Sequence, residues 1–251
     1  MGLPLCPATH NSLRHLLQQG HSFARELILT RKPEKLPTAS TKDRILDAAE
    51  TLFANEGFHC TSLRTLTKKA DVNLAAVNYH FGSKEALVEA MMERRLQALN
   101  PQREALLDKV LERALNEERP PRSEDILRAF IEPTINFSES GKGPRHFIAF
   151  IGRILMDPDD SLRNMFLKRI RPLFVSFYKA MCEALPEVPP QTVFMRLQMT
   201  LGLISHVMCS IERYTGTSRE FPLPPGIPPI ENAQELCEVI LEFVLPGLEK
   251  S

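Results

Sequence analysis

The chain has 251 residues, of which 43% are hydrophobic and 25% are charged, and this predicts a globular protein with a small domain and a larger one. Lysine and arginine total 31, as do aspartate and glutamate, so the net charge gives no argument for bulk attraction to nucleic acid or to an anionic membrane. The scattered cysteines form no CxxC pair, which predicts reduced thiols in a cytoplasmic protein without a metal site or cofactor; they are Cys6, Cys60, Cys182, Cys209 and Cys237.

The sequence contains no candidate membrane segment. No apolar run reaches the roughly 18 to 20 residues that span a bilayer, and the N-terminus lacks an apolar region followed by a signal-cleavage site. We therefore expect a soluble intracellular protein with no membrane partner. Residues 1–40 carry five basic side chains against two acidic ones and four prolines, and they are predicted to form a flexible or partly helical extension.

From residue 41 onward apolar residues recur at helical spacing, and no run alternates with a period of two. The sequence therefore predicts an all-α fold. Asn100-Pro101 and the Gly-Lys-Gly-Pro sequence at 141–144 are predicted to separate helices, and the proline-rich stretch at 215–229 to be an exposed connection. The predicted helices are 42–56, 62–70, 74–80, 83–99, 101–118, 124–139, 145–156, 160–185, 190–213 and 233–247.

Two short helices joined by a tight turn are predicted after residue 60. Thr61 is placed to cap the helix at 62–70, and Asn73 is placed to cap the helix at 74–80. The outer side of the first of these helices carries Arg64, Lys68 and Lys69. Such a pair is either a simple helical hairpin or the helix-turn-helix of a DNA-binding protein, and the pattern alone leaves both open.

The helix at 74–80 is predicted to have one buried and one exposed side. At about 100° per residue, Leu74, Val77 and Phe81 fall on the buried side. Small residues on the opposite side let a helix enter the major groove of DNA, an asparagine can read adenine, and tyrosine and histidine suit phosphate oxygens. That opposite side carries Ala75, Ala76, Asn78, Tyr79 and His80.

The stretch RILDAAETLFANEGFHCTSLRTLTKKADVNLAAVNYHFGSKEAL resembles the N-terminal signature of the TetR family of transcriptional regulators. The resemblance includes the Gly57-Phe58 turn and the Tyr-His-Phe-x-x-Lys ending. It implies a three-helix helix-turn-helix domain at 41–95 and a larger helical domain at 96–251 for effector binding and dimerisation. It also implies a homodimeric repressor, not an enzyme, that binds palindromic double-stranded operator DNA and releases it on binding a small effector.

Carried over residue by residue, the resemblance places DNA contacts in both helices and at the start of the next one. One departure is that the reading helix contains no lysine or arginine, so specificity is expected to depend on apolar contacts, on Asn78 and on DNA shape. The predicted DNA-binding residues, with Arg64 added from its outward position, are Thr61, Ser62, Arg64, Asn73, Leu74, Ala75, Asn78, Tyr79, His80 and Lys84.

Phenylalanine and methionine are concentrated between residues 147 and 208, which suits either an adaptable apolar pocket or an ordinary helical core. Segments here resemble the PsrA-type branch, whose members respond to long-chain fatty acids or acyl-CoA esters. We therefore expect an apolar effector whose head group pairs with an arginine, Arg196 included, or bonds a histidine. The predicted effector-binding residues are Arg145, His146, Phe150, Arg153, Phe177, Met181, Met199 and His206.

A strip of small residues on the helix at 190–213 is a candidate for close helix packing. Gly202, Ser205 and Cys209 follow one another at spacings of three and four residues, which suits a partner helix of either the same chain or another. The family resemblance implies that this helix and the one at 233–247 form a four-helix bundle across a two-fold axis.

Three other functions remain as alternatives. The same fold can regulate efflux or stress genes in response to drug-like or aromatic ligands, or serve as a lipid-binding or partner-binding module without DNA. An enzyme acting on acyl groups is the alternative from another class, but the sequence contains no GxSxG, Walker, GxGxxG or HExxH motif.

Overall fold

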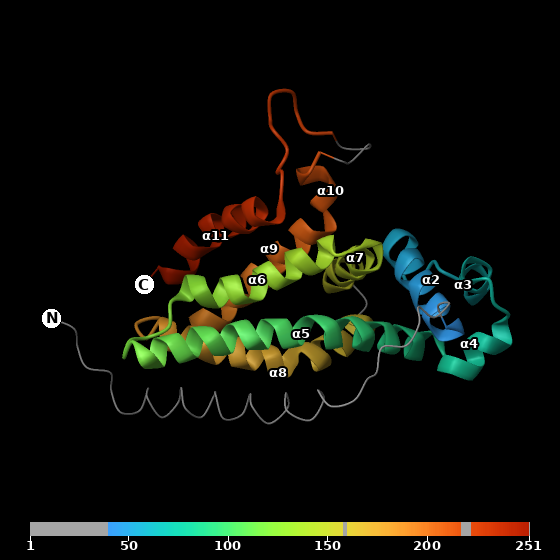
Figure 1. Cartoon of the computed structure of the whole chain (residues 1–251), viewed down its shortest axis with the longest axis horizontal. Helices are drawn as coiled ribbons and strands as arrows, with labels where there is room; N and C mark the ends of the chain where they lie inside the picture. Colours follow the sequence, from blue (N-terminus) through green and yellow to red (C-terminus); the bar gives the residue numbers. More distant parts are fainter. Residues whose placement is uncertain (1–39, 158–159, 217–221, 251) are drawn as a thin grey trace, which may run out of the picture. The chain divides into compact units, whose positions relative to one another are not determined.

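The computed structural model describes residues 40–157, 160–216 and 222–250, and these residues form helices and their connections (Figure 1). No strand occurs in this part of the chain, which confirms the predicted all-α fold. None of its helices is long and apolar enough to cross a membrane. The extension predicted at residues 1–40 lies, except for Ser40, outside the described residues.

Most helices agree with the predicted ranges to within one turn, because local apolar periodicity and capping residues set their ends. They are α2 (Thr41–Glu56), α3 (Leu63–Ala70), α4 (Leu74–Phe81), α5 (Lys84–Asn116), α6 (Ser123–Glu139), α7 (Lys142–Met156), α8 (Asp160–Ala184), α9 (Pro190–Cys209), α10 (Ile211–Tyr214) and α11 (Ala233–Glu249).

The predicted helix break at Asn100-Pro101 is wrong, since α5 runs through Pro101. A proline inside a helix removes one hydrogen bond and costs about 3 kcal/mol. Leucines at 96, 99, 107 and 111 are nonetheless buried on both sides of the proline. Each buried leucine contributes about 1.5 to 3 kcal/mol, so their common apolar stripe outweighs the local cost.

The predicted loop at 141–144 is also shorter than expected. Helix α7 begins at Lys142, which places Pro144 in its first turn. A proline is tolerated there because the N–H groups of the first turn have no helical partner. The predicted helix at 190–213 is interrupted at Ser210, whose backbone N–H donates to the carbonyls of His206 and Val207.

The chain divides into two compact units. In the first, α2 packs against α3, α4 and α7. The ring of Phe53 lies at its centre, 5.5 Å from the ring of Phe58 and 6.0 Å from that of Phe150. The domain boundary predicted at residue 95 stays a prediction, because this unit also includes α7. We call it the N-terminal unit, and its described residues are 40–98, 137–157 and 160–168.

A buried ion pair joins α2 to the first half of α5 within the N-terminal unit. The carboxylate of Glu50 is completely buried and accepts hydrogen bonds from Arg95 at 2.7 and 2.6 Å and from Arg94 at 2.6 Å. Gly143 of α7 lies against this pair, so a Cβ at that position would meet the Arg95 guanidinium and the arginine side chain would have to shift.

The second unit, here the C-terminal unit, includes described residues 99–136, 169–216 and 222–250. Helices α6 and α8 meet through Phe130 and Phe177, whose rings stack edge to face at 5.3 Å. Helix α11 packs on α9, and Arg128 of α6 pairs with Glu238 of α11 at 2.6 Å. The proline-rich connection is exposed over its described part, as predicted, and extends away from α11 in Figure 1.

Candidate nucleic-acid interface and apolar cavity

Side-chain caps fix both sides of the turn between α3 and α4. Ser62 caps α3 by accepting a hydrogen bond from the backbone N–H of Thr65 at 3.0 Å. Asn73 caps α4 by accepting from the N–H of Ala76 at 2.8 Å, as predicted. Between them Asp71 adopts a left-handed conformation with φ 53°, which ends α3 sharply. The result is two short helices held at a fixed angle, the arrangement of a helix-turn-helix.

The expectation that Thr61 caps α3 is wrong. Its side chain is buried, and its hydroxyl donates to the carbonyl of Gly57 at 2.8 Å, so it stabilises the preceding turn. Ser62, one residue later, has the extended backbone and the exposed hydroxyl that a cap requires. The structure thus places Thr61 in the support of the turn and leaves Ser62 at the surface.

Arg44 of α2 stabilises the same turn from outside it. Its Nε and Nη2 donate to the carbonyl of Ala70 at 3.0 and 2.9 Å, and Nη2 also reaches the carbonyl of Asp71. Sequence reasoning missed this residue because it acts across 26 positions, and no local pattern marks such a contact. The guanidinium satisfies carbonyls at the end of α3 that have no helical partner.

Helix α4 turns one side to the core and the rest to the surface. Val77 is buried, whereas Tyr79 is 86% exposed. Leu74 was expected on the buried side, but as the first residue of the helix it is 49% exposed. The exposed surface of α4 and its cap carries Asn73, Leu74, Ala75, Asn78, Tyr79 and His80.

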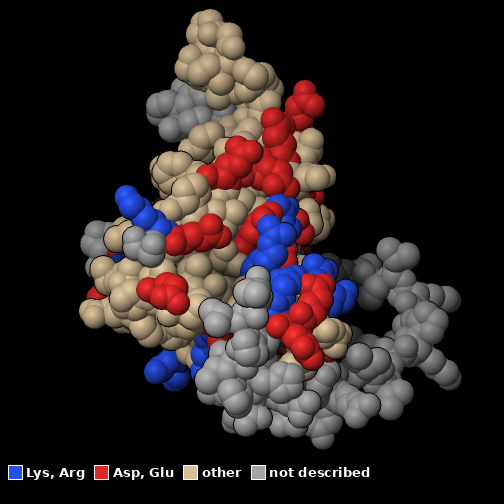
Figure 2. Space-filling view, turned by 90° about the vertical axis from the view of Figure 1, so that its left-hand side faces the viewer, with Lys and Arg blue, Asp and Glu red and all other residues tan. Residues whose placement is uncertain are grey.

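The positive charges nearest to α4 belong to α3. Arg64, Lys68 and Lys69 are all exposed on that helix. Elsewhere acids and bases are mixed: on the face shown in Figure 2, basic side chains lie among acidic ones over the part formed by described residues. The balanced charge of the chain is therefore compatible with a local basic surface at α3.

Lys84 is turned toward the protein. Its ammonium donates to the carbonyl of Phe58 and lies 4.1 Å from the centre of the Phe58 ring, a cation–π contact. Burial lowers the pKa of this lysine below its usual value. The side chain thus fastens the start of α5 to the turn after α2, a role that sequence reasoning missed. Its predicted phosphate contact stays a prediction.

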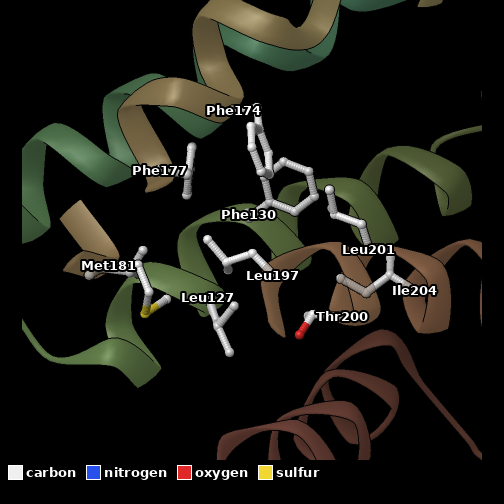
Figure 3. Close-up of a pocket in the computed structure, with 10 residues that line it drawn as sticks. Leu127, Phe130, Phe174, Phe177, Met181, Leu197, Thr200, Leu201 and Ile204 are labelled. Atoms are coloured by element: carbon white, nitrogen blue, oxygen red, sulfur yellow. The ribbon is translucent and has the colours of Figure 1, made fainter. Parts of the chain in front are cut away.

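The C-terminal unit contains a small apolar cavity, partly open to solvent, among α6, α8 and α9 (Figure 3). Its polar lining residue is Thr200, whose hydroxyl donates to the carbonyl of Arg196 in its own helix at 2.9 Å. The cavity can therefore contact an apolar ligand through dispersion forces but can form few hydrogen bonds with it. The lining residues are Ile126, Leu127, Phe130, Phe174, Phe177, Met181, Leu197, Thr200, Leu201 and Ile204.

The structure brings two of the predicted effector residues to this cavity, Phe177 and Met181. The lining residues on α6 were missed because α6 precedes the phenylalanine-rich and methionine-rich region, and leucine and isoleucine do not distinguish a cavity from a core. The predicted arginines do not line it either, and Arg196 instead donates to the carbonyl of Leu248 at 2.8 Å.

The remaining predicted effector residues lie elsewhere. Phe150 is buried beside Phe53 in the N-terminal unit. Four of them are exposed on α7 and α9, namely Arg145, Arg153, Met199 and His206. His146 is half-buried on α7, and its Nδ1 lies 3.4 Å from the hydroxyl of Thr51.

Comparison with known families accounts for both parts of the molecule. Residues 45–91, which contain the helix-turn-helix, match the family described as bacterial regulatory proteins of the tetR family. Residues 128–245, which contain most of the cavity lining, match the tetracyclin repressor-like C-terminal domain. The chain belongs to the TetR family. Regulators of this family bind DNA, are typically dimers and respond to small molecules, as the sequence resemblance implied.

Curated relatives match this TetR-family chain mainly over the helix-turn-helix. The probable HTH-type transcriptional regulator YttP of Bacillus subtilis is 45% identical over 53 residues, which are 21% of this chain and 26% of YttP. The negative regulator IcaR of the Staphylococcus aureus biofilm operon icaADBC is 36% identical over 59 residues, which are 24% of this chain and 32% of IcaR. The alignments thus span about a quarter to a third of these relatives.

Similarity of fold extends over most of the chain. The fatty acid degradation regulator FadR of Bacillus halodurans superposes with a TM-score of 0.56 at 15% identity, covering 87% of this chain and 100% of that one. At this identity the likeness shows the TetR fold alone.

An exposed apolar surface extends over α9 and α11. Met199 of α9 is 67% exposed and Phe243 of α11 is 74% exposed, with Met195 and Val239 also exposed on the same two helices. The predicted strip of small residues is only partly on this surface. Ser205 is buried, and its hydroxyl donates to the carbonyl of Leu201 in its own helix. The apolar side chains, more than the small ones, therefore distinguish this surface of the TetR-family chain.

Proposed function

We propose that this chain is a homodimeric repressor of transcription that binds palindromic operator DNA through α3 and α4 and releases it when an apolar effector binds. The observation that carries the proposal is the surface of α4. Both ends of the turn before it are fixed by side-chain caps, its core side is held by Val77, and small and polar side chains cover its exposed side.

Each exposed residue of α4 suits a particular DNA group. Ala75 lets the helix approach the floor of the major groove, and the exposed Leu74 offers methyl groups to thymine. Asn78 is the candidate for adenine, and Tyr79 and His80 are candidates for phosphates. Arg64, Lys68 and Lys69 of α3 add the positive charge that α4 lacks, and Ser62 can donate to a further phosphate.

The exposed apolar surface of α9 and α11 supports a homodimer. Large apolar side chains on two helices that pack together form a surface that a second copy covers at a two-fold axis. Two reading helices about 34 to 36 Å apart then enter successive major grooves of a palindrome. This arrangement gives dimerisation a role in recognition.

The cavity supports an apolar effector. Its lining is apolar except for Thr200 and includes three phenylalanine rings, which favour an apolar ligand. An acyl-type ligand, a fatty acid or acyl-CoA as in the PsrA-type branch, suits such a lining. A drug-like or aromatic ligand is the alternative that a ligand screen distinguishes.

Selection of DNA by the purified full chain tests the proposal. From a pool of random duplexes, the protein should enrich palindromic sequences. Replacing the exposed Tyr79 by alanine should weaken binding of the selected duplex at least about tenfold without changing the thermal unfolding temperature. The matched control is Tyr178→Ala in α8, which should bind like the wild type. A pool that shows no enrichment over input would overturn the repressor function.

A further inference from the structure

Arg103 of α5 is a buried cation that pairs with no carboxylate in the part of the chain that the structure describes. It is only 5% exposed and belongs to the C-terminal unit. Its terminal nitrogens donate to the side-chain carbonyl of Asn100 at 3.1 Å and to the hydroxyl of Thr134 at 2.7 Å. Its Nε has no hydrogen-bond partner among the described residues, and none of their ion pairs includes this side chain.

This arrangement is unfavourable for the protein by itself. A guanidinium removed from water needs an anionic partner or a complete set of acceptors, and two neutral acceptors provide neither. Burial lowers the pKa of Arg103 to about 9, which still leaves it charged at neutral pH. By contrast, Arg128 on the neighbouring helix pairs with Glu124, Glu132 and Glu238. Over the described ranges the chain contains carboxylates that could partner an arginine, and none of these pairs with Arg103.

One aromatic ring separates this charge from the cavity. The guanidinium carbon lies 4.2 Å from the centre of the Phe130 ring, and Phe130 is a lining residue of the cavity. In Figure 3 this ring lies close to Phe174 and Leu201 on the inner wall. The Phe130 ring thus lies between the Arg103 guanidinium and the cavity.

We propose that Arg103 binds the head group of a monoanionic amphiphile, a carboxylate with an apolar chain, whose chain fills the cavity between α6, α8 and α9. The inference rests on the effector function proposed above and names the charge of the effector. A carboxylate matches the two parallel N–H donors of a guanidinium and is small enough for a buried position. The bulky, multiply charged head group of a CoA ester does not fit beside a side chain that is 95% buried.

The same contact provides a connection to α5 and α6. Arg103 and Thr134 join these helices next to Pro101 and Pro133, each of which removes one helical hydrogen bond. A carboxylate that draws the guanidinium away from Asn100 and Thr134 releases the two helices at their weakest points. Since α5 begins at Lys84, directly after the turn that follows α4, the movement acts on the helix that holds the reading helix.

The test compares ligands that differ only in charge on the full-length protein. Calorimetry with dodecanoate should give a dissociation constant at least about tenfold lower than with dodecan-1-ol. In Arg103→Met the preference for the acid should disappear while binding of the alcohol remains. The control Arg196→Met, an arginine of the same unit that contacts a helix carbonyl outside the cavity lining, should keep the preference.

Several results would overturn the inference: equal binding of acid and alcohol by the wild type, a retained preference in Arg103→Met, or strong binding of dodecanoyl-CoA with none of dodecanoate. Removal of the buried charge should leave the unfolding temperature unchanged or higher, so the variant is expected to fold. If Arg103→Met does not fold, the comparison of acid and alcohol with the wild type still tests the inference. Arg103→Lys, which keeps the charge but loses the paired donors, then replaces that variant and should show a weaker preference for the acid.

Failure of the inference is distinguishable from failure of the repressor function. DNA selection without ligand examines the helix-turn-helix alone. If the protein prefers the acid but selects no DNA, Arg103 is supported as an anion site and the repressor function is contradicted. If it selects DNA but shows no preference for the acid, the repressor function is supported and the role of Arg103 is contradicted.

Discussion

The two units of the molecule treat a buried charge in opposite ways. In the N-terminal unit the carboxylate of Glu50 is completely buried and neutralised by Arg94 and Arg95. In the C-terminal unit the guanidinium of Arg103 is almost as deeply buried, and its hydrogen-bond acceptors among the described residues are neutral. A satisfied pair makes a unit rigid, which suits the positioning of a reading helix. A buried charge without a counter-charge favours binding of an anion, which suits the effector recognition proposed above.

The largest expected effect comes from breaking the satisfied pair. Glu50→Gln removes the carboxylate that Arg95 pairs with and leaves Arg94 only its surface partners Asp43 and Asp47, so it should lower the free energy of unfolding by about 3 kcal/mol. Chemical denaturation measures it. Asp47→Asn is the control, since Asp47 pairs with Arg94 at the surface and should cost less than about 1 kcal/mol. Arg103→Met is expected to leave the free energy of unfolding unchanged. If Glu50→Gln lowers that free energy no more than the control does, the two units do not differ in how they use a buried charge.

A second buried group sharpens the comparison. Glu183, at the end of α8 in the C-terminal unit, has a carboxylate oxygen with no hydrogen-bond partner among the described residues. Burial raises its pKa from 4.5 to about 7. Between these two pH values the folded protein retains a proton that the unfolded chain has lost, so stability falls as the pH rises through this window.

Glu183→Gln should therefore be more stable than the wild type by about 1 to 2 kcal/mol above pH 7 and should show little difference near pH 4.5. Thermal unfolding measured at intervals between pH 4.5 and 8 checks this. Glu187→Gln serves as the control, because Glu187 is exposed. A difference that is constant over the whole range would mean that the effect is not one of charge.

The smallest effect expected concerns the cap of the reading helix. Asn73→Ala removes the acceptor of the Ala76 N–H and should cost about 1 kcal/mol, whereas Asn73→Asp keeps the acceptor and should cost less. Equilibrium unfolding compares the two variants. If they are equally stable, the turn before α4 is held by Arg44 and the core, and the cap adds little to the rigidity of the N-terminal unit.

The helix-turn-helix of the N-terminal unit could be predicted because capping and turn residues mark it in the sequence. No such local pattern marks the residues that line the cavity. The ends of α3 and α4 follow from Ser62, Asn73 and the turn between them, so the helix-turn-helix could be predicted within about a residue. The break at Pro101 was predicted wrongly because the rule for proline is local, whereas the buried leucines that override it act through tertiary packing.

Functional residues that act over long sequence separations could not be predicted. Arg44 reaches Ala70, and Glu50 reaches Arg95, through contacts that no spacing in the sequence indicates. Arg103 looks like any surface arginine of an amphipathic helix until its burial and the absence of a carboxylate beside it are known. The arginines predicted from the family resemblance lie on α7 and α9, and they do not line the cavity.

The most direct test of the account is a titration of the selected palindromic duplex with the full chain, followed by fluorescence anisotropy with and without dodecanoate. The account predicts tight binding of the duplex without ligand and a dissociation constant at least about tenfold higher in the presence of dodecanoate. Allosteric coupling between two ligands is typically about 1 to 3 kcal/mol, which is a change in affinity of about 5-fold to 150-fold. In Arg103→Met the response to dodecanoate should disappear. A wild-type protein that binds the duplex equally well with and without dodecanoate would contradict it.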